Sequence, residues 1–168
     1  MTKSSTLSSI CSFRKEPVSV EEIQTESYIT TESMLPNKGG LKKASLMPSK
    51  GTISRYCSGD TLISNIRPYF KKIWHANCNG GCSNDVLVIM PKSCLSEYLY
   101  WILSDDKFFE YTTATAKGTK MPRGDRIAIM NYPVPDNDIV RQRAIVSALS
   151  PIRKKIQLND RINDYLAA

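Results

Sequence analysis

The alternation of hydrophobic and polar positions along the chain predicts several β-strands. The clearest lies in GDTLISNIRPYFKKIW at residues 59–74, where Leu62 and Ile66 fall on one face of a strand and Ile63 on the other. The apolar run at residues 85–90 has the composition of a buried strand. Shorter strands are predicted at residues 27–31, 52–57 and 126–132.

A three- and four-residue spacing of hydrophobic positions predicts helices. Leu95, Tyr98, Leu99, Ile102 and Leu103 follow this spacing, and Ser93 is the N-cap expected for their helix. A shorter helix is expected at residues 105–111. Another is expected near the N-terminus, where Leu7 and Ile10 are one turn apart. The apolar side of each helix must pack on a core.

From about Asp138 the pattern is helical to the end of the chain. Ser150 and Pro151 form an N-cap and N1 signal, which predicts that a second helix starts there. Five of its positions have the 4-3-4-3 spacing of a coiled-coil seam: Ile152, Ile156, Asn159, Asn163 and Leu166. The two asparagines would lower the stability of a helix pair and fix its register. The final helix is therefore expected to pair with another helix.

The composition fits one domain of ordinary size with an appended element. The chain has 168 residues, of which 41% are hydrophobic and 23% charged. Because strands and helices do not alternate, a doubly wound parallel fold is excluded. We expect an α+β (mixed α/β) globule over residues 1–137 and a helical arm over residues 138–168. No apolar window reaches a membrane-spanning length, and no signal-peptide pattern is present, so a soluble intracellular protein without a membrane partner is expected.

One segment of the chain carries the excess positive charge. The net charge is +7. Residues 36–72 contain a single acid, Asp60, and eight cations: Lys38, Lys42, Lys43, Lys50, Arg55, Arg67, Lys71 and Lys72. The rest of the chain is therefore neutral overall. This concentration predicts a surface that faces a polyanion, and nucleic acid is the polyanion that we favour.

Three polar loops contain glycine and could approach a ligand closely. They lie at residues 36–40, 77–81 and 116–125, and the third is basic through Lys117, Lys120 and Arg123. In the segment after residue 66, Arg67 can form a bidentate contact with a guanine edge or hold a phosphate. Lys71 and Lys72 can contact phosphates. Tyr69 and Trp74 are interpreted as core or groove-wall aromatics.

The sequence gives little support for catalysis or a metal site. Five cysteines without paired spacing predict reduced thiols in a cytosolic compartment. His75, Cys78 and Cys82 lack the C-x₂-C spacing of a zinc site, so no metal is expected. Asp60 and Asp85 are not followed by the lysine of a metal-dependent nuclease. The chain has no phosphate-binding glycine motif and no aromatic-proline tetrapeptide of a DNA methyltransferase.

Several ordered blocks resemble the target recognition domain in the specificity subunit of type I restriction–modification systems. The resemblance rests on residues 59–74, on GGCSNDVLV at residues 80–88 and on GTKMPRGD at residues 118–125. Residues 132–166, from YPVP through Gln142 to Leu166, are similar to the proline-rich exit into the conserved spacer helix. The family usually has Glu-Gln where this chain has Arg141 and Gln142. The blocks cover nearly everything from Tyr28 onward.

The resemblance implies a twisted, mostly antiparallel sheet with flanking helices, followed by a coiled-coil-type arm. It implies strand ends and loops that face double-stranded DNA. The expected DNA-binding residues are Lys38, Lys42, Lys43, Arg67, Tyr69, Lys71, Lys72, Lys117, Lys120 and Arg123. The chain would bind no cofactor and contain no catalytic residue, and it would read one half of a bipartite target.

The resemblance also implies partners, in a bacterial or archaeal cytoplasm. A methyltransferase subunit would bind S-adenosylmethionine and modify adenine, and a restriction subunit would cleave DNA within the same complex. The seam residues would pair with another specificity helix, including one in a homodimer, and dock the methyltransferase. Because a typical specificity subunit has two recognition domains, we expect a half-sized subunit or a truncated chain.

Two other functions remain open from the residues alone. A small metal-dependent nuclease would use Asp60 or Asp85. A single-stranded RNA-binding module would use Tyr69 and Trp74 as stacking platforms.

Overall fold

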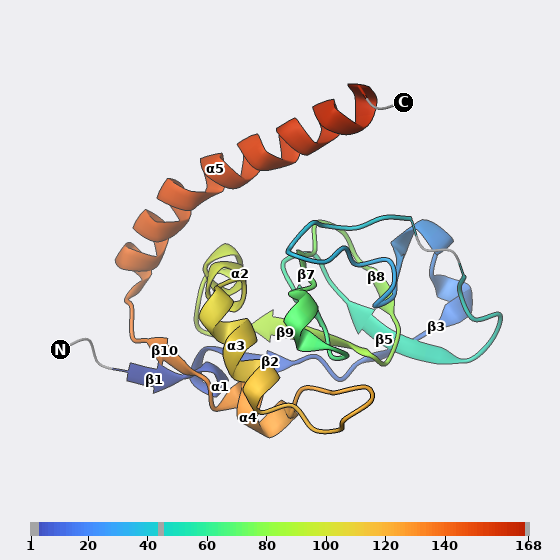
Figure 1. Ribbon diagram of the computed structural model, residues 1–168, viewed down its shortest axis with the longest axis horizontal. Coiled ribbons are helices and arrows are strands. Elements are labelled where there is room, and N and C mark those ends of the chain that lie inside the picture. The colour runs from blue at the N-terminus through green and yellow to red at the C-terminus, as the bar shows by residue number, and fades with distance from the viewer. Residues whose placement is uncertain (1–3, 44–45, 167–168) are drawn as a thin grey trace. The chain divides into compact units, whose positions relative to one another are not determined.

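The computed structural model describes residues 4–43 and 46–166. Its central feature is an antiparallel sheet with the strand order β2-β9-β6-β7. Strands β2, β9 and β7 of this sheet are labelled in Figure 1. The strands are β2 (Cys11–Phe13), β6 (Thr61–Ser64), β7 (Ile73–His75) and β9 (Val86–Pro91). The two best strand predictions are thus confirmed, and they pair directly, with Leu62 opposite Val88 and Ile63 opposite Leu87.

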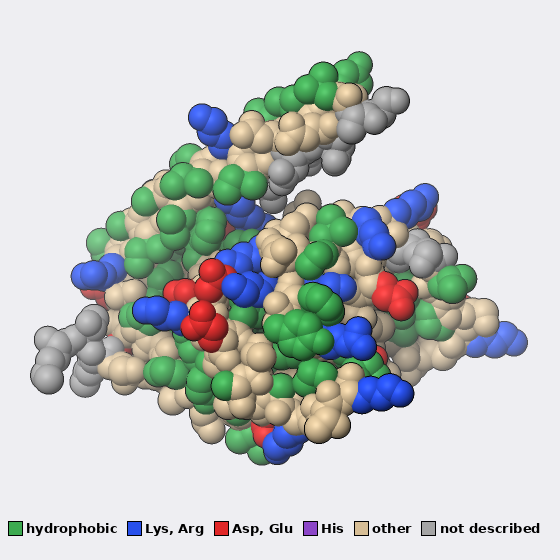
Figure 2. Space-filling model, in the orientation of Figure 1, with side chains coloured by type: hydrophobic (Ala, Val, Ile, Leu, Met, Phe, Trp, Pro, Cys, Tyr) green, Lys and Arg blue, Asp and Glu red, His purple; other side chains and the backbone are tan. Residues whose placement is uncertain are grey.

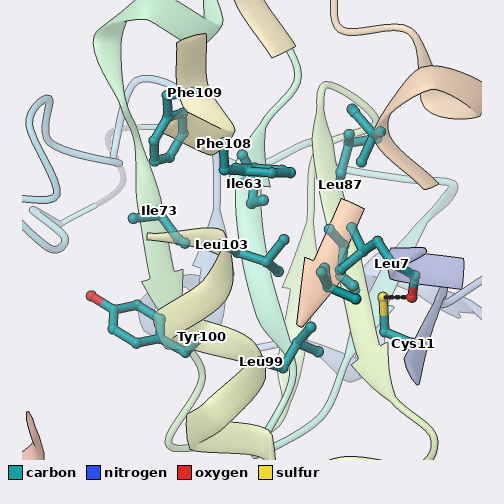
Figure 3. Packing of buried hydrophobic residues seen from close by; sticks show 13 residues of the cluster. Leu7, Cys11, Ile63, Ile73, Leu87, Leu99, Tyr100, Leu103, Phe108 and Phe109 are labelled. Carbon is teal, nitrogen blue, oxygen red and sulfur yellow. Dashed lines mark hydrogen bonds between the residues drawn. The ribbon is translucent and has the colours of Figure 1, made fainter. Parts of the chain in front are cut away.

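Helices cover one face of the central sheet. They are α2 (Ser96–Leu103) and α3 (Asp106–Ala114). Figure 3 shows Leu99, Leu103 and Phe108 packed with the sheet residues Ile63 and Ile73, and all five side chains are buried. Removing one such side chain from water contributes about 1.5–3 kcal/mol. The periodicity that predicted the helix near residues 95–103 therefore reflects real core contacts.

A second sheet covers the opposite face, in the order β3-β5-β8-β4. Its strands are β3 (Pro17–Ser19), β4 (Tyr28–Ile29), β5 (Thr52–Tyr56) and β8 (Gly80–Cys82). They pair antiparallel except for β4 and β8, which are parallel. Tyr56 and Cys82 pack against Leu62 and Val88 between the sheets. A Cβ atom on Gly80 would overlap the Ser27 carbonyl oxygen and the Tyr56 ring, so only glycine fits there.

Short elements complete the globule. Strand β1 (Ser4–Thr6) pairs antiparallel with β10 (Pro133–Pro135), so the first described strand lies beside the last one. The helix predicted near the N-terminus is confirmed as the single turn α1 (Leu7–Ile10). Three short 3₁₀ helices are η1 (Val20–Glu22), η2 (Thr25–Ser27) and η3 (Pro68–Phe70). The predicted mostly antiparallel architecture is correct, but it is divided among separate sheets.

The loop predicted at residues 77–81 is wrong in part, because Gly80 and Gly81 belong to strand β8 and are buried. Three predictions of helices and strands are also wrong. The strand expected at residues 126–132 is the helix α4 (Arg126–Met130), because the Asp125 carboxylate accepts hydrogen bonds from the backbone N–H groups of Ile127 and Ala128 and caps it. Helix α2 begins at Ser96, and the Ser93 hydroxyl donates to the Ser9 carbonyl instead of capping it.

The third error concerns the arm. No new helix starts at Ser150, because α5 (Ile139–Leu166) is continuous and contains Pro151. A proline removes one backbone donor, and here the helix-forming residues on both sides outweigh that loss. The chain divides after Asp136 into the globule and a unit that contains α5.

A buried ion pair joins the end of β2 to the start of β6. The guanidinium of Arg14 donates to Asp60 through Nε, at 2.7 Å from Oδ2, and through Nη2, at 3.1 Å from Oδ1. The backbone N–H of Cys57 also donates to Oδ2, at 2.8 Å. The Asp60 side chain is 3% exposed and that of Arg14 is 14% exposed. The hydrogen bond to Asp60 raises the pKa of Arg14.

We predict that Asp60→Ala lowers the free energy of unfolding by about 3–5 kcal/mol, because it leaves a buried guanidinium without its carboxylate. Urea unfolding measures this change. The control is Glu16→Gln, which removes the other carboxylate of Arg14, a side chain that is 59% exposed. That variant should lose about 0–1 kcal/mol. Equal losses in the two variants would show that burial of the Arg14–Asp60 pair has no special role.

Candidate nucleic-acid interface

Three loops that are distant in the sequence are joined by backbone hydrogen bonds. Residues 34–43, 65–72 and 117–124 make up this basic loop cluster. The first two loops are linked from Asn37 N to Phe70 O, at 2.8 Å, and from Lys38 N to Lys71 O, at 2.9 Å. The second and third are linked from Arg67 N to Pro122 O, at 2.8 Å, and from Gly124 N to Asn65 O, at 3.0 Å. The loops therefore form one connected structure at the end of β6.

The backbone of the cluster is unusual. Among the described residues, four that are not glycine have a positive φ, and all four belong to the cluster: Asn37 (54°), Lys38 (63°), Arg67 (50°) and Lys71 (52°). Arg67 and Lys71 flank the 3₁₀ turn η3, which Pro68 begins. A left-handed residue with a side chain costs about 1–2 kcal/mol. Such residues often occur at ligand-binding sites.

Several cations of the cluster have partners within the protein. Lys38 Nζ and Lys71 Nζ lie 2.8 and 3.0 Å from Oδ1 of Asp106, the first residue of α3. These two ammonium groups lower the pKa of Asp106, Lys38 more than Lys71. Lys72 donates to the Thr31 carbonyl at 2.6 Å and lies 5.8 Å from the Phe70 ring centroid. Its burial lowers its pKa.

The third loop has its own ion pairs. Lys117 Nζ lies 2.6 Å from Oδ2 of Asp125, and Arg123 Nη2 lies 3.0 Å from Oδ1 of Asp85. The hydrogen bond from Lys117, with those from the backbone at the start of α4, lowers the pKa of Asp125. Backbone bonds in both directions between Lys117 and Arg123 close the loop. These residues therefore fix the conformation of the loop as well as giving it positive charge.

Three cations of the cluster are exposed and have no side-chain partner within residues 4–43 and 46–166: Lys42, Arg67 and Lys120. Arg67 does not pair with Asp60 or Asp85, because these carboxylates are held by Arg14 and Arg123. Lys43 has only a long contact with Glu26, at 3.9 Å.

The surface around these cations also presents aromatic side chains. Tyr69 and Phe70 are 47% and 40% exposed, and their ring centroids lie 4.8 Å apart. Figure 2 shows that Lys and Arg side chains on the visible face alternate with hydrophobic ones, and that acidic side chains lie directly beside some of them. The surface therefore combines cations with flat rings rather than forming one uniform basic patch.

Sequence reasoning found the basic residues of the cluster but missed Asp106, Asn37 and Phe70. Asn37 gave a weak signal, because asparagine is enriched in left-handed conformations and stands beside Gly39 and Gly40. Asp106 gave no signal, because its lysine partners are remote in the sequence.

Neither a metal-dependent nuclease nor a zinc site gains support from the structure. Asp60 is occupied by Arg14, and Asp85 by Arg123. In the described part of the chain, no three His, Cys, Asp or Glu side chains are grouped as metal ligands. Cys82 lies in the core, where burial raises its pKa to about 12 and keeps the thiol protonated. The same residues include no helix with the length and hydropathy of a membrane span.

The arm presents apolar side chains to solvent. Of the predicted seam, Ile152 and Ile156 are each 56% exposed and Leu166 is 76% exposed, with Asn159 and Asn163 also exposed. Leu158, Ile162 and Tyr165 form a second exposed apolar stripe that the seam analysis missed. Pairing of this helix with another one stays a prediction.

Comparison with known proteins identifies the fold. No protein-family model and no curated protein matches the chain. The HsdS subunit from Thermoanaerobacter tengcongensis superposes with a TM-score of 0.69 at 20% identity, over 98% of this chain and 45% of that one. A chain from a study of complex assembly and conformational transition of the type I R-M system superposes with a TM-score of 0.68 at 19% identity, with the same coverage of both chains. The type I restriction–modification S subunit from M. genitalium superposes with a TM-score of 0.60 at 17% identity, over 98% of this chain and 44% of that one.

The chain thus spans less than half the length of the S subunits that it resembles. The resemblance inferred from the sequence is confirmed at the level of the fold. Over 98% of its length, the protein has the fold of an S subunit of a type I restriction–modification system, and it matches about 45% of that subunit's length.

Proposed function

We propose that the chain is a sequence-specific, double-stranded DNA-binding component of a type I restriction–modification system. The observation that carries the proposal is the basic loop cluster, displayed on a fold shared with S subunits over 98% of this chain. One of the loops connects β6 to β7 and another connects α3 to α4, and hydrogen bonds between the loops fix the backbone that carries the exposed cations. In this role the protein reads one half of a bipartite target and catalyses nothing itself.

The cations of the cluster have different roles in the proposal. Arg67 has a planar guanidinium with no protein partner among the described residues, and its backbone is fixed by Pro122. It is the candidate for a bidentate contact with a guanine edge. Lys42, Lys43 and Lys120 are flexible point charges suited to phosphates. Tyr69, which is 47% exposed and two residues from Arg67, is the candidate for contact with the wall of the DNA groove. Lys38, Lys71, Lys72, Lys117 and Arg123 hold the loops in place while adding positive potential.

The partners in the proposal follow from the S-subunit fold. Helix α5 pairs with another specificity helix, in a homodimer or a larger assembly, and docks a methyltransferase subunit that carries S-adenosylmethionine. A restriction subunit joins the same complex. The complex works in the cytoplasm of a bacterium or archaeon.

Neither alternative function is favoured. A nuclease would need Asp60 or Asp85 available for a metal, and both carboxylates are held by arginines. An RNA-binding platform would need the Trp74 ring free for stacking, whereas this ring is half-buried and packs edge-on against Tyr56, with centroids 5.7 Å apart.

The direct test of the function is a map of methylated adenines across the genome. Deleting the gene should remove methylation at one sequence motif, because the methyltransferase subunit would lose its target recognition. A copy carrying Glu110→Gln, an exposed position outside the cluster, should restore it. An unchanged methylation map, or cleavage of DNA by the isolated protein with magnesium, would contradict the proposed function.

We predict that Arg67→Ala and Lys42→Ala weaken DNA binding in different ways. Loss of a base contact by Arg67 should cost about 1–3 kcal/mol of discrimination at one target position. Loss of a phosphate contact by Lys42 should weaken binding to every sequence and reduce the salt slope by about one unit. Affinities for all single-base variants of the target, measured at several salt concentrations, separate the two effects. An equal loss on every target for Arg67→Ala would reassign this residue to the DNA backbone.

We predict that Ile156→Asp disrupts helix pairing, because it places a charge in the apolar seam of α5. Sedimentation velocity, alone and with the methyltransferase subunit, should show loss of assembly with no change in the melting temperature of the globule. The matched control is Ile127→Asp on α4, where the isoleucine is 76% exposed and lies outside the arm. If both variants assemble as well as the unmodified protein, the seam assignment is wrong.

A further inference from the structure

One carboxylate holds two lysines of the basic loop cluster. Oδ1 of Asp106 lies 2.8 Å from Lys38 Nζ and 3.0 Å from Lys71 Nζ. The backbones of the two lysines are themselves bonded, from Lys38 N to Lys71 O at 2.9 Å. Their side chains therefore start from adjacent points of the backbone, and the shared carboxylate offsets the repulsion between their ammonium groups.

The position of Asp106 is fixed by the core. It is the first residue of α3, and η3 packs against this helix. Phe108 and Phe109 anchor the same turn, with 0% and 1% of their surfaces exposed. The Asp106 side chain is 55% exposed, whereas those of Lys38 and Lys71 are 32% and 31% exposed. The carboxylate thus stands beside the loops on a rigid support, and the lysines fold back onto it.

Sequence-independent affinity for DNA grows with the number of cations that neutralise phosphates. Two lysines that share a carboxylate add a net charge of one to the interface rather than two. Their donors are also directed at the protein. Base discrimination depends instead on the placement of Arg67, which lies on the η3 turn that ends at Lys71.

We propose that Asp106 is a specificity-determining residue of the interface: it occupies Lys38 and Lys71, keeps both out of phosphate binding, and fixes the turn that presents Arg67. This inference rests on the proposed function. Asp106 touches no base in this arrangement. It acts through the two lysines, by lowering non-specific affinity and by holding the reading loop in position.

The test compares Asp106→Asn with Glu110→Gln. Glu110 lies one turn further along α3 and is exposed, with no ion pair among the residues described. Both substitutions raise the net charge by one, but only the first releases the lysines. The full-length proteins are titrated, at several salt concentrations, with a random-sequence duplex pool and with the duplex that the unmodified protein enriches from that pool.

Asp106→Asn should steepen the salt slope on the random pool by about one to two units, because up to two more phosphates are neutralised. The ratio of affinities for the enriched duplex and the random pool should fall several-fold. Glu110→Gln should leave the slope unchanged. Asp106→Glu, which keeps the charge, should behave like the unmodified protein, and adding Lys38→Met and Lys71→Met to Asp106→Asn should reverse the increase in slope.

Identical slopes and affinity ratios for Asp106→Asn and Glu110→Gln would overturn the inference and leave the proposed function standing. The same holds if Asp106→Asn lowers the melting temperature and weakens binding equally on both duplexes, since that is the effect of a scaffold residue. An unmodified protein that does not bind the random pool and enriches no duplex from it would overturn the proposed function and this inference with it.

Discussion

The candidate interface depends on hydrogen bonds between the backbones of loops, not on a sheet or helix of its own. Arg67 shows why. Its left-handed conformation costs about 1–2 kcal/mol, and its N–H bond to the Pro122 carbonyl contributes about 0.5–1.5 kcal/mol. The two values are similar, so the hydrogen bond to the neighbouring loop offsets the cost of the Arg67 conformation. The three loops therefore act as a unit, and β6, buried on both faces, gives that unit a rigid base.

The parts of the fold that the sequence predicted are those in which side-chain periodicity reports burial directly. Strands β6 and β9 and helix α2 meet the core through many apolar positions, and their patterns are strong. The strand expected at residues 126–132 was wrong because Ile127 and Ile129 alternate as in a strand, whereas Ile127 is 76% exposed. There the cap from Asp125 decided the conformation, and a cap depends on two or three local hydrogen bonds that hydrophobic periodicity does not report.

For the candidate site too, the sequence predicted some features and not others. The concentration of cations between residues 36 and 72 was visible in the composition, and the structure brings Lys38, Arg67 and Lys71 into one cluster. Their ionic partners were not visible, because Asp106 meets Lys38 only after α3 packs against η3. A formal charge can be counted along a chain, but its availability to a ligand depends on tertiary contacts.

In the proposed function, this difference between the charge of a cation and its availability to phosphate allows a strongly basic segment to discriminate between DNA sequences. If every cation between residues 36 and 72 bound phosphate, affinity would be high on any sequence and discrimination would be small. In the structure, Asp106 occupies two of these cations, Lys38 and Lys71. Asp125 and Asp85 likewise occupy Lys117 and Arg123 of the third loop. The same pairs hold the loops against the globule, so the carboxylates that reduce the free charge also define the shape. Arg67, which none of them holds, is then presented on a surface whose geometry is set by its neighbours.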